Sequence, residues 1–118
     1  MKQEEILILI PKIEKYIEYM LNVILKLPRT EKFSIGNEYK VSMYKMLTNA
    51  IYINKVGNKL EYLNTIDAEL VLERIYLRLI LKNRWIDEKK FKVSIELIAE
   101  IGKIVGGLIK YYAQNNKK

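Results

Sequence analysis

The 118-residue chain contains neither cysteine nor histidine. Without cysteine it can form no disulfide bonds, so a cytoplasmic location is the expected one. Cysteine and histidine are also the commonest zinc ligands, and histidine is the commonest general base. Metal-binding four-helix bundles use Glu-x-x-His pairs, which this sequence cannot supply. We therefore expect a protein that is not an enzyme and that holds no metal or cofactor.

Long apolar runs are missing as well, although half of the residues are hydrophobic. The longest run, residues 6–11, is far shorter than the roughly eighteen residues that cross a membrane. A signal peptide is not expected, because the charges before that run are mixed and no small-residue cleavage site follows it. We expect a single domain over residues 1–118 that buries its own core, with no membrane partner.

Only two prolines are present, and both indicate helix boundaries. We interpret Pro11 as the first residue of a helix, where its missing N–H and fixed φ do no harm. That helix continues to about Leu27, and Pro28 ends it. Residues 1–10 are either an early part of the same helix or an extended strap, and the sequence leaves both open. The apolar positions of this helix step by four and three: Ile13, Ile17, Met20, Ile24 and Leu27.

Three further helices are predicted after the link PRTEKFSIG, residues 28–36. They run from a Ser34 cap to about residue 55, from about 59 to 83 after the Gly57-Asn58 break, and from an Asp87 cap to about 113. Residues 114–118 form a polar tail that we expect to fray. Two apolar stripes support the second and the last helix: Tyr39, Met43, Met46, Ala50 and Ile53, and Ile98, Ile101, Val105 and Leu108. Four long helices with short links predict an all-α, up-down-up-down antiparallel four-helix bundle.

Glycine is rare, yet three of the five glycines fall in the stretch EIGKIVGGLIK, residues 100–110. The apolar spacing of this stretch is helical, and each glycine inside a helix costs about 1 kcal/mol relative to alanine. Because glycine lets another helix approach closely, we interpret Gly102, Gly106 and Gly107 as a close-packing surface. The alternative is that the helix ends at Gly106 and Gly107.

The third helix, around LVLERIYLRLILK, is apolar nearly all the way round. One side suffices for a bundle core, so a second apolar side suggests a subunit interface. We assign Leu72, Ile75 and Leu79 to the core. The predicted oligomer or partner interface is the opposite side, with Leu70, Arg74, Leu77, Arg78 and Leu81. A partly buried arginine needs a partner, which is either a carboxylate of another helix or subunit, or a phosphate.

The bundle topology brings the first and the last of the three links to the same end. Eight basic residues and only three acidic residues lie there, which gives +5 of the net charge of +7. A region of one sign attracts polyanions, mostly through contacts to phosphates, although it is also compatible with a merely solubilising surface. The predicted RNA- and DNA-binding residues of this basic pole are Lys26, Arg29, Lys32, Lys82, Arg84, Lys89, Lys90 and Lys92.

Several motifs resemble a known family of small four-helix proteins. They are LPR at Leu27–Arg29, KFSIG at Lys32–Gly36, RIYLR at Arg74–Arg78 and EIGKIVGGLIK at Glu100–Lys110. The family comprises the accessory variability determinant proteins of diversity-generating retroelements and related proteins encoded in intervening sequences of 23S ribosomal RNA genes. The position before the last isoleucine is often tryptophan in that family, whereas this chain has Leu108.

The resemblance implies a specific function. Retroelement members are non-catalytic homopentameric barrels that bind the element's reverse transcriptase together with RNA and DNA. The complex supports mutagenic reverse transcription and retrohoming into a variable protein gene. The resemblance further implies that Arg74 and Arg78 serve the pentamer or the transcriptase surface. The alternative is a self-assembling bundle of the ribosomal intervening-sequence type, with an RNA- or ribosome-associated role and no transcriptase partner.

Overall fold

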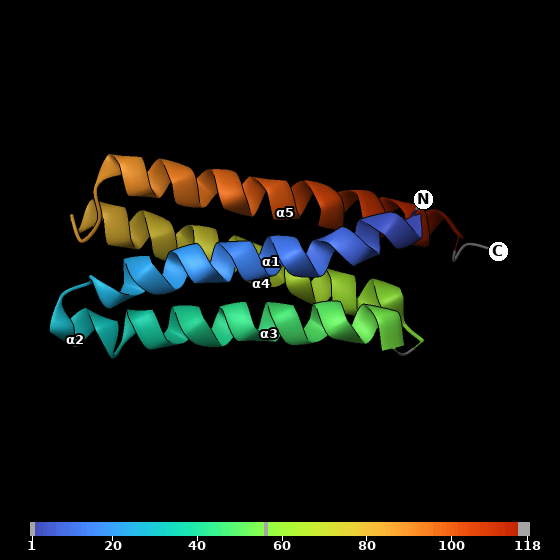
Figure 1. The fold of residues 1–118 in the computed structure, drawn as a ribbon, viewed down its shortest axis with the longest axis horizontal. Coiled ribbons are helices and arrows are strands. Elements are labelled where there is room, and N and C mark those ends of the chain that lie inside the picture. The colour runs from blue at the N-terminus through green and yellow to red at the C-terminus, as the bar shows by residue number, and fades with distance from the viewer. Residues whose placement is uncertain (1, 56, 116–118) are drawn as a thin grey trace.

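A computed structural model describes residues 2–55 and 57–115 of the chain, with side chains from residue 5 onward. These residues form the helices α1 (Lys2–Leu25), α2 (Arg29–Lys32), α3 (Ile35–Lys55), α4 (Lys59–Lys82) and α5 (Glu88–Asn115), and no strand. The four long helices run alternately in opposite directions (Figure 1). The described part of the chain is therefore an antiparallel four-helix bundle, as the sequence predicted.

Each long helix packs against two neighbours. Helices α1 and α4 each contact both α3 and α5, so that α1 lies diagonally opposite α4. The bundle measures 50 × 22 × 21 Å. Helix α2 and the α4–α5 link lie at one end, and the α3–α4 link lies at the other end with both termini (Figure 1). This arrangement confirms that the first and last links share a pole.

The stripes that the sequence predicted in α1, α3 and α5 are confirmed as the core. Their side chains are buried because an amphipathic helix gains free energy only when its apolar face leaves water. The core continues toward the N-terminus, where Ile6 and Leu9 are also buried. Residues 2–10 therefore belong to α1, which selects the helical extension over the extended strap.

The interpretation of Pro11 as a helix start is wrong, since Pro11 lies inside α1. A proline within a helix leaves the carbonyl four residues earlier, here that of Leu7, without its N–H partner. Both Leu7 and Pro11 are exposed, so water can reach this carbonyl. The buried residues on both sides of Pro11 then hold the helix together.

One of the two predicted helix caps, Asp87, is confirmed, and Asn58, predicted only as part of a break, is a further cap. The Asp87 carboxylate accepts a hydrogen bond from the Lys90 N–H at 2.8 Å and so begins α5. Asn58 accepts from the Glu61 N–H at 3.2 Å and begins α4. The prediction of Ser34 as the cap of α3 is wrong: Ser34 directly precedes α3, but its hydroxyl donates to the Thr30 carbonyl of α2 at 3.2 Å and accepts no N–H of α3 among the described residues. Helix α2 lies in the segment that was predicted only as a link between two helices. In the polar tail, residues 114 and 115 are the last of α5, and residues 116–118 lie outside the described residues.

The prediction for the two sides of α4 is wrong. Leu70 and Leu77 are fully buried in the core, on a stripe that also includes Leu63, Ile66, Glu73 and Ile80. Ile75 and Leu79, which were assigned to the core, are 39% and 45% exposed. They continue Val71, 49% exposed, as an outward apolar stripe. Because α4 is apolar on both sides, spacing alone could not tell which one faces the bundle.

The close-packing interpretation of the α5 glycines is also largely wrong. A side chain at Gly106 would meet nothing within 4 Å, and one at Gly107 would make only ordinary contact with Glu5. At Gly102 a Cβ would lie 3.2 Å from the Arg74 guanidinium, so this glycine makes room for a side chain and not for a helix backbone. Helix α5 continues through all three glycines.

The glycine that packing does require is Gly36, buried at the start of α3. A Cβ there would lie 3.0 Å from Ile24 Cγ2 and 3.2 Å from the Glu31 carbonyl oxygen. Because these contacts are at or below the usual limit for a Cβ, the absence of a side chain lets α3 begin against the end of α1. The glycine thereby fixes where the first link of the pole turns.

Candidate nucleic-acid interface

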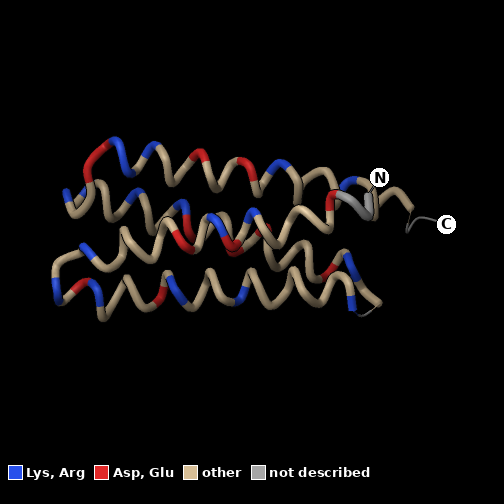
Figure 2. Tube along the Cα trace, in the orientation of Figure 1, with Lys and Arg blue, Asp and Glu red and all other residues tan. Residues whose placement is uncertain are grey.

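The eight predicted basic residues do come together at one pole of the bundle. Figure 2 shows Lys and Arg in both links at this end. Lys32 and Lys90 are half-buried, whereas the other six are exposed: Lys26, Arg29, Lys82, Arg84, Lys89 and Lys92. The placement follows from the antiparallel topology, which folds two basic links onto one face.

The positive charge of the basic pole is not neutralised locally. The two ion pairs seen among described residues, Lys12–Glu100 at 2.8 Å and Lys45–Glu69 at 3.3 Å, involve none of the eight basic residues. The three acidic residues of the pole, Glu31, Asp87 and Glu88, leave an excess of +5. Such a field attracts anions and raises their rate of association.

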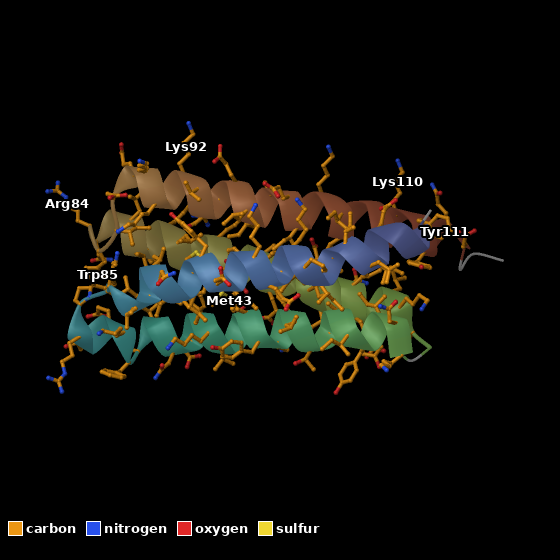
Figure 3. The ribbon with its side chains drawn as sticks, viewed as in Figure 1. Met43, Arg84, Trp85, Lys92, Lys110 and Tyr111 are labelled. Atoms are coloured by element: carbon orange, nitrogen blue, oxygen red, sulfur yellow. The ribbon has the colours of Figure 1, made fainter. Side chains whose placement is uncertain are left out.

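Arg84 holds a strained position in the α4–α5 link. Its φ of 61° lies in the left-handed region, which glycine usually occupies after a helix. The turn is closed by hydrogen bonds from the Arg84 N–H to the Leu81 carbonyl at 2.9 Å and from the Trp85 N–H to the Ile80 carbonyl at 3.0 Å. A non-glycine residue in this conformation costs roughly 1 kcal/mol. The guanidinium extends from the end of the bundle (Figure 3).

Sequence reasoning missed an aromatic residue in the same region. Phe33, directly after α2, is 67% exposed and is the most exposed large hydrophobic side chain among the described residues. Trp85 in the other link is half-buried and packs against the core. The sequence did contain a signal for its exposure: Phe33 lies in a polar link and belongs to none of the apolar stripes of the helices.

The five residues of the predicted interface on α4 do not lie on one surface. Leu70 and Leu77 are core residues, Leu81 and Arg74 are half-buried, and Arg78 is exposed. Neither arginine forms an ion pair with a carboxylate of the described residues. The predicted salt bridge between helices of one subunit is therefore not observed in this part of the chain. Beside the two arginines lies the exposed apolar stripe of Val71, Ile75 and Leu79.

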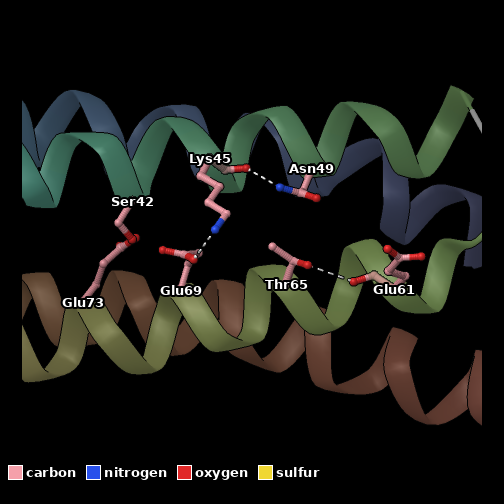
Figure 4. A network of polar contacts seen from close by, with 7 residues as sticks. All are labelled: Ser42, Lys45, Asn49, Glu61, Thr65, Glu69 and Glu73. Atoms are coloured by element: carbon pink, nitrogen blue, oxygen red, sulfur yellow. Dashed lines mark hydrogen bonds and ion pairs between the residues drawn. The ribbon is translucent and has the colours of Figure 1, made fainter.

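A buried polar cluster in the middle of the bundle was also missed. The Glu73 carboxylate of α4 accepts hydrogen bonds from Tyr16 of α1 at 2.7 Å and from Ser42 of α3. Figure 4 shows Ser42 and Glu73 pointing toward each other. Tyr39 of α3 bonds to the Tyr16 hydroxyl, and since Tyr16 donates its proton to Glu73, Tyr39 is the donor. The sequence signal for this cluster was Glu73 itself, a charged residue at helical spacing between the apolar residues Leu70 and Leu77 of α4.

Burial governs the ionisation of this cluster. It raises the pKa of Glu73 to about 7, against the opposing effect of the hydrogen bonds from Ser42 and Tyr16. It also raises the pKa of Tyr16 and of Tyr39 well above the usual value. Because Glu73, Tyr16 and Tyr39 have no solvent exposure, no substrate can reach them. We therefore assign the cluster a structural role across three helices.

The rest of the described surface shows no cluster of side chains that is arranged as a ligand or metal site. An open groove between α3 and α4 is crossed by the Lys45–Glu69 ion pair (Figure 4). Within the described residues, no group of three or more acidic side chains is placed to hold a metal ion. None of the described helices is long and apolar enough to cross a membrane. The basic pole and the outer side of α4 thus remain as candidate interfaces.

Comparison with known proteins identifies the family. A family model described as bAvd-like matches residues 7–112, whereas a comparison with curated proteins gave no match. The matched segment extends from the first turns of α1 to the last turn of α5 and contains the whole basic pole. On this evidence the chain belongs to the bAvd-like family, as its motifs predicted.

Proposed function

We propose that this protein is a non-catalytic accessory subunit of a diversity-generating retroelement. In this role it binds the reverse transcriptase of the element together with RNA and DNA during mutagenic reverse transcription and retrohoming. The observation that carries the proposal is the bAvd-like match over residues 7–112. The basic pole supports the nucleic-acid part, because its cations are in excess, form no ion pair with a carboxylate of the described residues, and so can attract a phosphate backbone.

The basic pole would hold nucleic acid through its phosphates. Its cations come from the short helix α2, from the links and from the adjacent ends of the long helices, and not from one continuous recognition helix. Affinity would then depend steeply on salt and weakly on sequence. Positioning of template or cDNA, without any chemical step, is the contribution expected from such a subunit in the cytoplasm.

The outer side of α4 would form contacts between subunits. Val71, Ile75 and Leu79 give an exposed apolar stripe. Next to it lie Arg74 and Arg78, neither of which pairs with a carboxylate in the part of the chain that the structure describes. A stripe of this kind gains free energy when a second protein surface covers it. We propose a homo-oligomer, with a pentamer as the expected state, and we place the interface on this stripe in place of Leu70 and Leu77.

The first experiment is to sequence a few kilobases of genomic DNA on either side of the gene. A reverse transcriptase gene beside near-identical repeats is the expected result, and it provides the partner for co-expression. Co-purification of that transcriptase with this protein would then complete the test. Ribosomal RNA sequence on both sides would contradict the proposal and support the intervening-sequence alternative.

Assembly has its own test, by light scattering with Ile75→Glu. A charge in the middle of the stripe should convert the oligomer into a folded 14.0 kDa monomer, because a carboxylate cannot be buried there without a partner. Val41→Glu is the matched control, at an exposed apolar position of α3 (61% exposed). A wild-type monomer would refute the oligomer.

Arg74→Ala with Arg78→Ala should weaken assembly or transcriptase binding. If the double variant keeps both assembly and transcriptase binding, the two arginines are ordinary surface residues.

A further inference from the structure

The exposed ring of Phe33 is the feature of the basic pole that charge does not explain. At 67% exposure it leaves most of a phenyl group in water, and contact with a ligand would lower the free energy of this surface. Phe33 ends the short helix α2, and no other aromatic residue lies between Tyr19 and Tyr39 in the sequence. The ring therefore has no aromatic neighbour within its own link.

Two basic residues lie close to Phe33 in the sequence. Lys32 precedes Phe33 directly, and Arg29, the first residue of α2, lies four residues earlier in the sequence. The acid of this segment, Glu31, is half-buried and accepts a hydrogen bond from the Ser34 hydroxyl at 3.3 Å. The exposed part of the segment thus includes the Phe33 ring and the Arg29 cation, while Lys32 and Glu31 are both half-buried.

We propose that Phe33 is a base-stacking platform and that the basic pole binds single-stranded RNA or DNA. Aromatic side chains within a positive surface bind single strands by stacking on bases while the cations follow the backbone. In a duplex the base faces are covered by neighbouring pairs, so only unpaired nucleotides can use the ring. This inference rests on the proposed nucleic-acid binding by the pole and adds the class of ligand to it.

A protein partner is the competing occupant of the same surface. Two cations beside an aromatic ring would also suit an acidic protein segment, but a single strand satisfies both features with every nucleotide, since each carries a phosphate and a base. The surface therefore favours the nucleic acid. Binding of a protein at Phe33 is an outcome that the experiment can detect and that would overturn the proposal.

The experiment measures fluorescence anisotropy with fluorescein-labelled oligothymidine and oligouridine of about twenty nucleotides, and with a duplex of the same length. Phe33→Ala should weaken binding to both single strands by roughly tenfold or more and leave duplex binding nearly unchanged. Phe33→Trp should keep the affinity, whereas Phe33→Leu should lose it, because leucine is apolar but has no flat face. The control is Tyr111→Ala, an exposed aromatic beside Lys110 at the opposite pole (Figure 3).

Salt dependence separates stacking from charge. Phe33→Ala should lower log K equally at all salt concentrations, because an uncharged ring releases no counterions. Arg29→Ala should instead reduce the slope of log K against log salt by about one contact. A change of slope in Phe33→Ala would show that the variant disturbs the cations, and it would contradict the stacking role.

The outcomes also separate this inference from the proposed function. If the wild type binds no oligonucleotide, nucleic-acid binding by the pole is refuted. If the wild type binds and Phe33→Ala binds equally well, only the stacking inference is refuted. If Phe33→Ala binds oligonucleotides normally but no longer co-purifies with the transcriptase, the ring is a protein contact and the inference is likewise wrong.

Discussion

The buried cluster around Glu73 and the basic pole differ in how their ionisable groups are exposed and paired. In the cluster, one carboxylate has no solvent exposure and receives hydrogen bonds from Tyr16 and Ser42. At the pole, eight basic residues lie near solvent and none pairs with a described carboxylate. The first arrangement satisfies every polar atom internally, whereas the second leaves its charges available.

The difference indicates where function lies. A buried polar group stabilises a fold only when its partners are already in place, so the Glu73 cluster fixes the relative register of α1, α3 and α4. The cations of the pole form no ion pairs among the described residues, and one of them, Arg84, has a left-handed backbone conformation. A region that gains nothing from its own charges within the subunit is the better candidate for a ligand site.

The largest effect is expected from reversing charge at the pole. Lys89, Lys90 and Lys92, all changed to Glu, should weaken oligonucleotide binding by more than roughly 100-fold at about 50 mM salt. The fold should persist, because Lys89 and Lys90 lie in the first turn of α5, where acidic residues are favourable, and Lys92 is exposed. Filter binding measures the affinity, and circular dichroism the helix content. Equal reversal of Lys55, Lys103 and Lys110 also lowers the net charge from +7 to +1 but lies outside the pole; an equal loss there would refute the role of the pole.

The second prediction concerns pH and the buried carboxylate. The pKa of Glu73 is raised from 4.5 to about 7 in the folded protein, so folding favours the protonated form. Its contribution to stability is thus fully present below pH 4.5 and is lost as the pH rises through about 7. The loss amounts to about 3 kcal/mol. Glu73→Gln, which cannot ionise, should escape it.

Urea unfolding of both proteins at several pH values tests this prediction. The difference in unfolding free energy between Glu73→Gln and the wild type should shift in favour of the variant by about 3 kcal/mol between pH 4.5 and pH 8. Oligonucleotide binding should not change, because the cluster lies away from the pole. A difference that stays constant with pH would show that Glu73 ionises normally and would weaken the contrast between the two regions.

The smallest effect is expected at Arg84, where stability and binding should change in opposite directions. Arg84→Gly should raise the unfolding free energy by about 0.5–1 kcal/mol, since glycine adopts the φ of 61° without strain. The same variant should bind oligonucleotides severalfold more weakly. Arg84→Ala keeps the strain and loses the guanidinium, so it should show the binding defect alone. Unchanged binding in both variants would make Arg84 incidental to the pole.

Much of the fold was predictable because three helices have one clear apolar stripe each. The cap at Asp87 and the break at Gly57-Asn58 then indicate where the helices begin and end. The basic pole followed without any tertiary information, since alternate links of an up-down bundle must share an end. The position of the candidate site was therefore largely a consequence of topology.

The errors arose where local patterns allowed two outcomes. Helix α4 is apolar on two sides, and only its packing against α3 and α5 decides that Leu70 and Leu77 point inward. Pro11 looked like a helix start because its local preference is strong, but the core contacts of Ile6 and Leu9 outweigh it. Phe33 was missed because exposure is a property of the folded surface.

The sequence by itself determined the four long helices, their antiparallel order and the charge collected at one end. These features follow from spacing, caps and connectivity, which act over a few residues at a time. The tertiary structure alone decided the inner side of α4, the use of Gly36 and Gly102, and the meeting of Glu73 with Tyr16, Tyr39 and Ser42. Those features depend on contacts between residues far apart in the chain, which no local pattern can encode.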